Sequence, residues 1–145
     1  DSQLLEPAAA EEETQPEAAV RRGFVLYRLG ANQEALTLLD AATPSDDVVD
    51  YWRSLIQGRV LLALGRQADA VSAYERASML APDAQTPAVA LMTIFLKSGD
   101  HEQAFGWAEP ARTTTENRGD SWPLYWSGYS RFLLPWLAEL REFQQ

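Results

Sequence analysis

Few residues of this chain have the types and spacing that catalysis would need. The 145 residues include one histidine and no cysteine, so thiolate and disulfide chemistry is excluded. His101 stands between Asp100 and Glu102, in the predicted turn after Gly99. That setting is typical of a lone surface histidine in a turn. The chain contains no phosphate-binding loop, no G-x-S-x-G motif and no H-E-x-x-H motif. We therefore predict that the protein is not an enzyme.

Two groups of carboxylates are the remaining candidates for chemistry, and both have a simpler explanation. Asp46, Asp47 and Asp50 stand at the predicted start of a helix, where negative charge is stabilised by the helix dipole. Their spacing is not that of an EF-hand calcium loop. Residues 11–13 are three consecutive glutamates, and such charge runs are usually solvated. The sequence therefore predicts no metal site and no cofactor.

The overall composition narrows the class of partner. The net charge of −9 argues against nucleic-acid binding, which needs a basic surface. No apolar run reaches the roughly 20 residues that a membrane-spanning helix requires, so we expect no membrane insertion in this segment. The first residue is Asp rather than Met. This start, the acidic N-terminal stretch and the lack of cysteine fit a protein of the bacterial periplasm or cell envelope, a secreted protein, or a cytosolic fragment.

Residues 51–84 form the stretch around which the other elements are organised. Apolar residues recur there at steps of three and four, which predicts two helices that each bury one side. Gly65 separates the two runs and suits a left-handed residue that ends a helix. Pro82 stops the second run. Gly58, Ala70 and Ala77 are small, which lets the two helix backbones approach closely, and Tyr74 is predicted to fill space between helix pairs.

The same pattern occurs three times. Leu29-Gly30, Leu64-Gly65 and Ser98-Gly99 are each followed, five residues after the glycine, by an alanine: Ala35, Ala70 and Ala104. The glycines are 35 and then 34 positions apart. Such a period predicts a stack of similar helix pairs.

The period, the small residues and the late proline resemble the tetratricopeptide repeat family. The resemblance implies an all-α fold, a short right-handed α-solenoid of antiparallel helix pairs. Three repeats would occupy residues 15–118, at about 16–50, 51–84 and 85–118. In that family the first helix of each repeat lines a concave groove. The groove residues implied here are Phe24, Tyr27, Arg28, Trp52, Arg59, Thr93 and Lys97.

Two segments flank the predicted repeats. Residues 1–14 are rich in Ala, Glu and Pro, which indicates a solvated linker or a spacer from a surface. Residues 119–145 predict an aromatic helix that caps the last repeat, because each repeat leaves an apolar side bare; the alternative is an exposed docking surface. Large side chains follow steps of three and four in this helix: Trp122, Tyr125, Trp126, Tyr129, Leu133, Trp136, Leu137 and Leu140.

Two functions follow as hypotheses. The first is a protein-interaction scaffold whose groove binds a peptide or partner helix, with aromatic anchors and with cations that attract carboxylates. The C-terminal helix or a neighbouring molecule could instead occupy that groove. The second is a self-assembling subunit that joins other copies of itself head to tail. Its adhesive residues would be Leu4, Leu5, Trp122, Trp126 and Trp136.

Overall fold

The computed structural model describes residues 16–44 and 46–113. Over these residues the chain is helical and has no strand, which confirms the all-α prediction for this part. The helices are α2 (Pro16–Arg28), α3 (Asn32–Ala41), α4 (Asp47–Ala63), α5 (Gln67–Leu80), α6 (Gln85–Ser98) and α7 (His101–Thr113). The predicted N-terminal segment and C-terminal helix lie outside the described residues.

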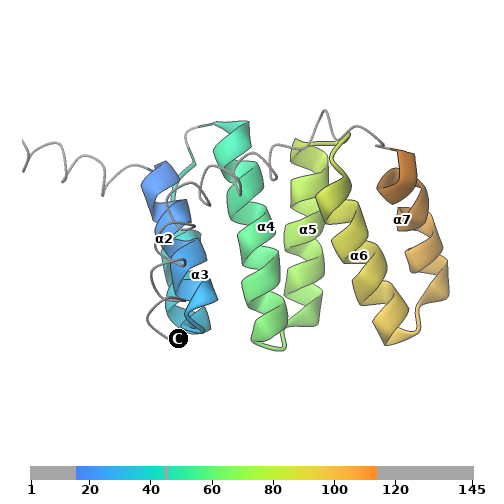
Figure 1. Cartoon of the computed structure of the whole chain (residues 1–145), viewed down its shortest axis with the longest axis horizontal. Helices are drawn as coiled ribbons and strands as arrows, with labels where there is room; N and C mark the ends of the chain where they lie inside the picture. Colours follow the sequence, from blue (N-terminus) through green and yellow to red (C-terminus); the bar gives the residue numbers. More distant parts are fainter. Residues whose placement is uncertain (1–15, 45, 114–145) are drawn as a thin grey trace, which may run out of the picture.

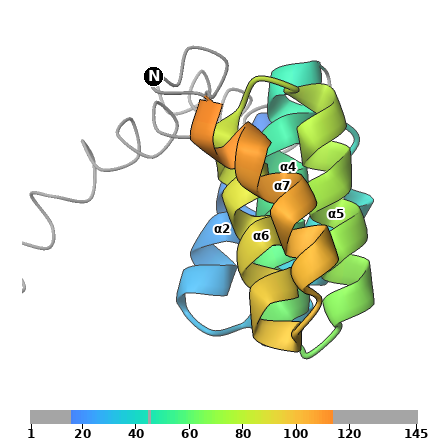
Figure 2. The ribbon, with the colours of Figure 1, turned by 90° about the vertical axis from the view of Figure 1, so that its right-hand side faces the viewer.

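The six helices stand side by side in the order of the sequence, with α2 at one end of the row and α7 at the other (Figure 1). Each helix packs against the next one, and α2 also packs against α4. Viewed along the row, α2 and α6 lie toward one side and α5 lies toward the other (Figure 2). The arrangement therefore exposes two different long sides.

The same turn joins the two helices of each predicted pair. Gly30, Gly65 and Gly99 all have positive φ, at 83°, 76° and 82°, a conformation that side-chain-bearing residues avoid. Each glycine N–H donates to the carbonyl three residues before it, and the following N–H donates to the carbonyl five residues before itself. These bonds satisfy carbonyls that the helix end leaves unpaired. The prediction of a left-handed glycine at position 65 is confirmed.

Within the first two pairs, a glycine of one helix receives a large side chain of the next. A Cβ atom built on Gly58 would lie 2.6–2.8 Å from the ring of Tyr74, and one on Gly23 would lie 2.7 Å from Leu39. Both glycines are buried. Leu39 and Tyr74 occupy equivalent repeat positions, so the two pairs use one packing solution with different side chains.

Polar contacts of α4 with its neighbours add to the apolar core. Asp46 caps α4 by accepting a hydrogen bond from the backbone N–H of Val49 at 2.9 Å. Asp50 is buried and its Oδ2 lies 2.7 Å from Nη2 of Arg76 on α5. Arg53 Nη1 donates to the carbonyls of Leu39 and Ala42 at the end of α3. The carboxylates of Asp46 and Asp50 therefore have structural roles.

Candidate protein-binding face

The predicted groove residues lie on α2, α4 and α6, and we call the solvent-accessible part of this set, with its neighbours, the first-helix face. Residues three or four apart share a side of a helix, so on each helix the members of the set lie on one side. The members that are at least partly exposed are Tyr27, Arg28, Trp52, Arg59, Leu62, Val89, Thr93, Leu96 and Lys97.

Apolar and basic side chains alternate on this face. Arg28, Thr93 and Lys97 are exposed, whereas Tyr27, Trp52 and Arg59 are half-buried. Three aliphatic side chains are also partly open to solvent, with exposed fractions of 38% for Leu62, 39% for Val89 and 50% for Leu96. A surface of this kind suits a ligand that offers both apolar side chains and carboxylates.

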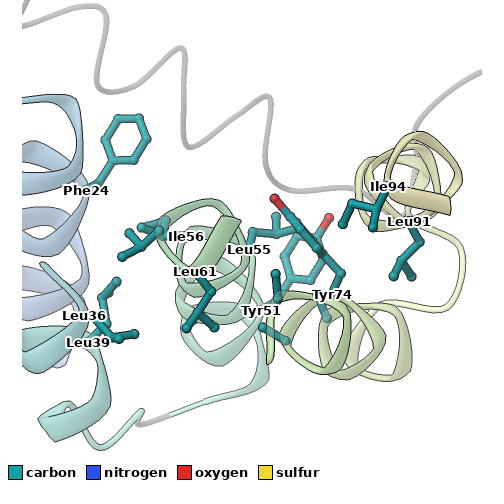
Figure 3. Packing of buried hydrophobic residues seen from close by; sticks show 14 of the residues in the cluster. Phe24, Leu36, Leu39, Tyr51, Leu55, Ile56, Leu61, Tyr74, Leu91 and Ile94 are labelled. Carbon is teal, nitrogen blue, oxygen red and sulfur yellow. The ribbon is translucent and has the colours of Figure 1, made fainter. Parts of the chain in front are cut away.

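Phe24 departs from its prediction as a groove anchor. The prediction requires an exposed ring, but the side chain is fully buried in this structure. The ring lies on the opposite side of Ile56 from Leu36 and Leu39 (Figure 3). It packs near the ring of Tyr27, with the ring centroids 6.3 Å apart and the planes tilted by 39°. Burial depends on neighbours distant in the sequence, and helical spacing alone does not report them.

Two tyrosines of the core reach toward the same side. The hydroxyl oxygens of Tyr51 and Tyr74 both point to the side of the row on which Phe24 lies (Figure 3). Burial raises the pKa of Tyr74 to about 12, while the charge of Arg59 lowers it and Tyr27 raises it. Arg59 and Tyr27 therefore act on the buried phenol from the first-helix face.

A second surface feature lies on α7, at the end of the row. An open hollow there has a mixed polar and apolar lining that includes two carboxylates; it is formed by Asp100, Glu102, Gln103, Gly106, Trp107 and Pro110. Beside it on the same helix, Phe105 is 79% exposed. The sequence did not single out this hollow. The spacing of Gln103, Gly106 and Pro110 along one side of a helix was the available signal.

The other predicted sites lie outside the first-helix face. Leu4, Leu5, Trp122, Trp126 and Trp136 lie outside the described residues. Among residues 16–44 and 46–113, no three His, Asp or Glu side chains gather closely enough to hold a metal ion. In the same ranges, no helix has the length and apolar character needed to span a bilayer.

Known proteins give no guide to the role of this face. No protein-family model, no curated protein and no solved structure matches this sequence.

Proposed function

We propose that this protein is a non-catalytic interaction scaffold with the architecture of a short right-handed solenoid of antiparallel helix pairs, similar to tetratricopeptide repeats. Two observations support the architecture. The turns at Gly30, Gly65 and Gly99 share one conformation and one hydrogen-bond pattern, and the contacts of Gly23 with Leu39 and of Gly58 with Tyr74 are equivalent.

The observation that carries the functional proposal is the mixed character of the first-helix face. Leu62 and Leu96 are partly exposed apolar residues, and Arg59 and Lys97 lie within three residues of them in the sequence. A peptide or partner helix with leucine or aromatic side chains would cover the apolar area. Its carboxylates would pair with the cations and fix its direction. The acidic net charge of −9 makes nucleic acid an unsuitable ligand.

A peptide library displayed on phage and selected on the full chain tests the proposal. We expect the selected peptides to combine acidic and large apolar residues. Reversing two cations of the face, Arg28→Glu with Arg59→Glu, should weaken the best peptide by at least about tenfold, the loss typical of disrupted charge pairs. The measurement is fluorescence anisotropy with a synthetic peptide.

A second double variant provides the control. Arg21→Glu with Arg66→Glu changes the net charge equally, but these exposed arginines pair with Glu17 and Asp69 on the surface. We expect this variant to bind the peptide like the wild type, and both variants to keep the far-UV circular dichroism of the parent. Equal losses in the two variants, or a selection without acidic peptides, would contradict the proposal.

Self-assembly through the ends of the row is the second candidate function, and one observation favours it. Phe105 is largely exposed on α7, next to the hollow that includes Trp107. Exposed aromatic side chains at an open end can join a neighbouring copy. Light scattering over a concentration series distinguishes the two functions. A homogeneous polymer that Phe105→Glu dissociates would favour assembly, and a strict monomer would exclude it.

A further inference from the structure

We infer that the C-terminal segment, residues 114–145, binds in cis to the first-helix face of the same molecule. This inference rests on the proposed function, because it names an occupant for the same surface. It assigns the aromatic segment a role as a competitor of the external partner. A partner would have to displace the segment. Its apparent dissociation constant would therefore be the intrinsic one divided by the fraction of molecules in which the segment has left the face.

The first supporting observation is a difference in burial between equivalent positions. Val20, Leu55 and Val89 occupy the same place in successive repeats, yet their exposed fractions are 0%, 1% and 39%. Each of the three helices that carry these positions packs mainly on the second helix of its own pair, α2 on α3, α4 on α5 and α6 on α7, and α2 and α4 also contact each other. Equivalent positions with comparable helix neighbours should be equally exposed. An additional apolar segment over α2 and α4 would account for the difference.

The second observation is the position of Phe24. Its ring is fully buried, but it lies beyond Ile56, away from the α3 residues Leu36 and Leu39 (Figure 3). The ring is therefore on the outer side of the row rather than between α2 and α3. A large apolar side chain in that place is stabilised only if another apolar group covers it.

Residues 114–145 have the composition and the length to provide this cover. Eight large side chains follow steps of three and four from Trp122 to Leu140, and such a stripe needs an apolar surface to pack against. The row from α7 to α2 contains five helix-to-helix steps of about 8–10 Å each, so it extends at most about 50 Å. Seven extended residues followed by 20 helical residues reach roughly 50 Å.

The two other candidate arrangements fit the chemistry less well. The accessible side of α7 is lined by Asp100, Glu102 and Gln103 and offers mainly Phe105 and Trp107 as apolar contacts. Those two aromatic side chains offer less apolar area than the stripe of eight large side chains would bury, and the adjacent Asp100 and Glu102 would lose hydration if it covered them. Residues 1–15 include two large aliphatic side chains, Leu4 and Leu5, among several glutamates. They have too little apolar area to cover both Phe24 and Leu55.

Hydrogen–deuterium exchange of the full chain, read by mass spectrometry, tests the inference. Tyr27→Glu with Leu62→Glu places two charges on the α2 and α4 part of the first-helix face, at positions that are already partly exposed. We expect this variant to increase the exchange rate of amides 121–140 at least about tenfold, because the charges disfavour the apolar contact. The matched control, Met79→Glu with Phe105→Glu, alters two exposed residues of α5 and α7. It should leave those amides unchanged.

Four results would overturn the inference. The first is exchange of amides 121–140 at random-coil rates in the wild type. The second is faster exchange in the Phe105 control, which would place the segment on α7 as a cap. The third is a response confined to residues 1–15, which would make the N-terminal segment the occupant. The fourth is protection that disappears on dilution, which would make a second copy the occupant.

Peptide binding separates failure of this inference from failure of the proposed function. Trp126→Ser with Trp136→Ser weakens the aromatic stripe and leaves the first-helix face intact. We expect the selected peptide to bind this variant several-fold more tightly than it binds the wild type. Unchanged affinity would contradict cis competition while leaving the scaffold function in place. Protection of amides 121–140 without any peptide binding would contradict the scaffold function alone.

Discussion

At the scale of single residues, the helix-interior glycines show how closely the first helix of a pair approaches the second. Gly58 leaves no room for a Cβ beside the buried ring of Tyr74, whereas a Cβ on Gly106 of α7 would meet no atom of the described residues within 4 Å. Alanine is intrinsically better than glycine in a helix by about 1 kcal/mol. The two glycines therefore separate the cost of crowding from the gain in helix propensity.

We expect Gly58→Ala and Gly106→Ala to change stability in opposite directions. Gly58→Ala should lower the free energy of unfolding by roughly 1–3 kcal/mol, because the added methyl overpacks the core. Gly106→Ala should raise it by up to about 1 kcal/mol. Urea denaturation followed by circular dichroism measures both. A stabilised Gly58→Ala variant would show that Tyr74 moves aside without cost.

The buried phenol of Tyr74 gives a prediction for alkaline pH. Its pKa is raised from 10.0 to about 12, mainly by burial, so between these values the unfolded chain loses the proton more readily than the folded chain. Folding stability should therefore fall as pH rises above 10. Relative to Tyr74→Phe, the wild type should lose about 1 kcal/mol between pH 8 and about pH 11. Parallel pH profiles of unfolding for the two proteins would contradict this account.

At the scale of the helices, Arg53 joins α4 to the end of α3. It donates to the carbonyls of Leu39 and Ala42, and its Nε lies 3.5 Å from Oδ1 of Asp50. Carbonyls at a helix end need partners from outside the helix. This side chain therefore connects two predicted repeats through the backbone of the first.

We expect Arg53→Ala to lower the free energy of unfolding by about 1–3 kcal/mol, because it leaves partly buried carbonyls without this donor and buried Asp50 without this neighbouring cation. Gln57→Ala is the control. Gln57 also connects α4 to α3, through Asp40 at 2.9 Å, but that bond is exposed, so its loss should cost at most about 0.5 kcal/mol. Chemical denaturation measures the two changes. Equal effects would show that the junction does not depend on Arg53.

At the scale of the whole molecule, a row of helices has weak ends and a strong middle. Helices α4 and α5 have neighbours on both sides, whereas α7 is the last described helix and packs mainly on α6 (Figure 1). In such a row, stability is approximately a sum of nearest-neighbour contacts. Local opening should therefore begin near α7.

Native-state hydrogen exchange should resolve this order. We expect amides of α4 and α5 to be the most protected and those of α7 to open with a free energy lower by at least about 1 kcal/mol. Uniform protection from α2 to α7 would contradict this expectation. It would indicate that the described helices unfold as one cooperative unit.

Much of the fold could be predicted from the sequence because its signals are local. The helix pairs follow from apolar residues three and four apart. The turns follow from Gly30, Gly65 and Gly99, since a left-handed residue is best supplied by glycine. The place of Tyr74 did not follow in the same way: its size predicts a residue that fills space between pairs, but its ring lies against Gly58 within the pair of α4 and α5.

The burial of Phe24 could not be predicted from the sequence. Its spacing in α2 put it on the side of Tyr27 and Arg28, and so predicted an exposed anchor, but the structure buries it completely. Periodicity determines which side of a helix a residue occupies. Whether that side meets solvent, as Val89 partly does, or is covered, as Val20 is, depends on segments far apart in the chain. Only the tertiary structure brings those segments together, and so only it decided which residues of the face remain accessible.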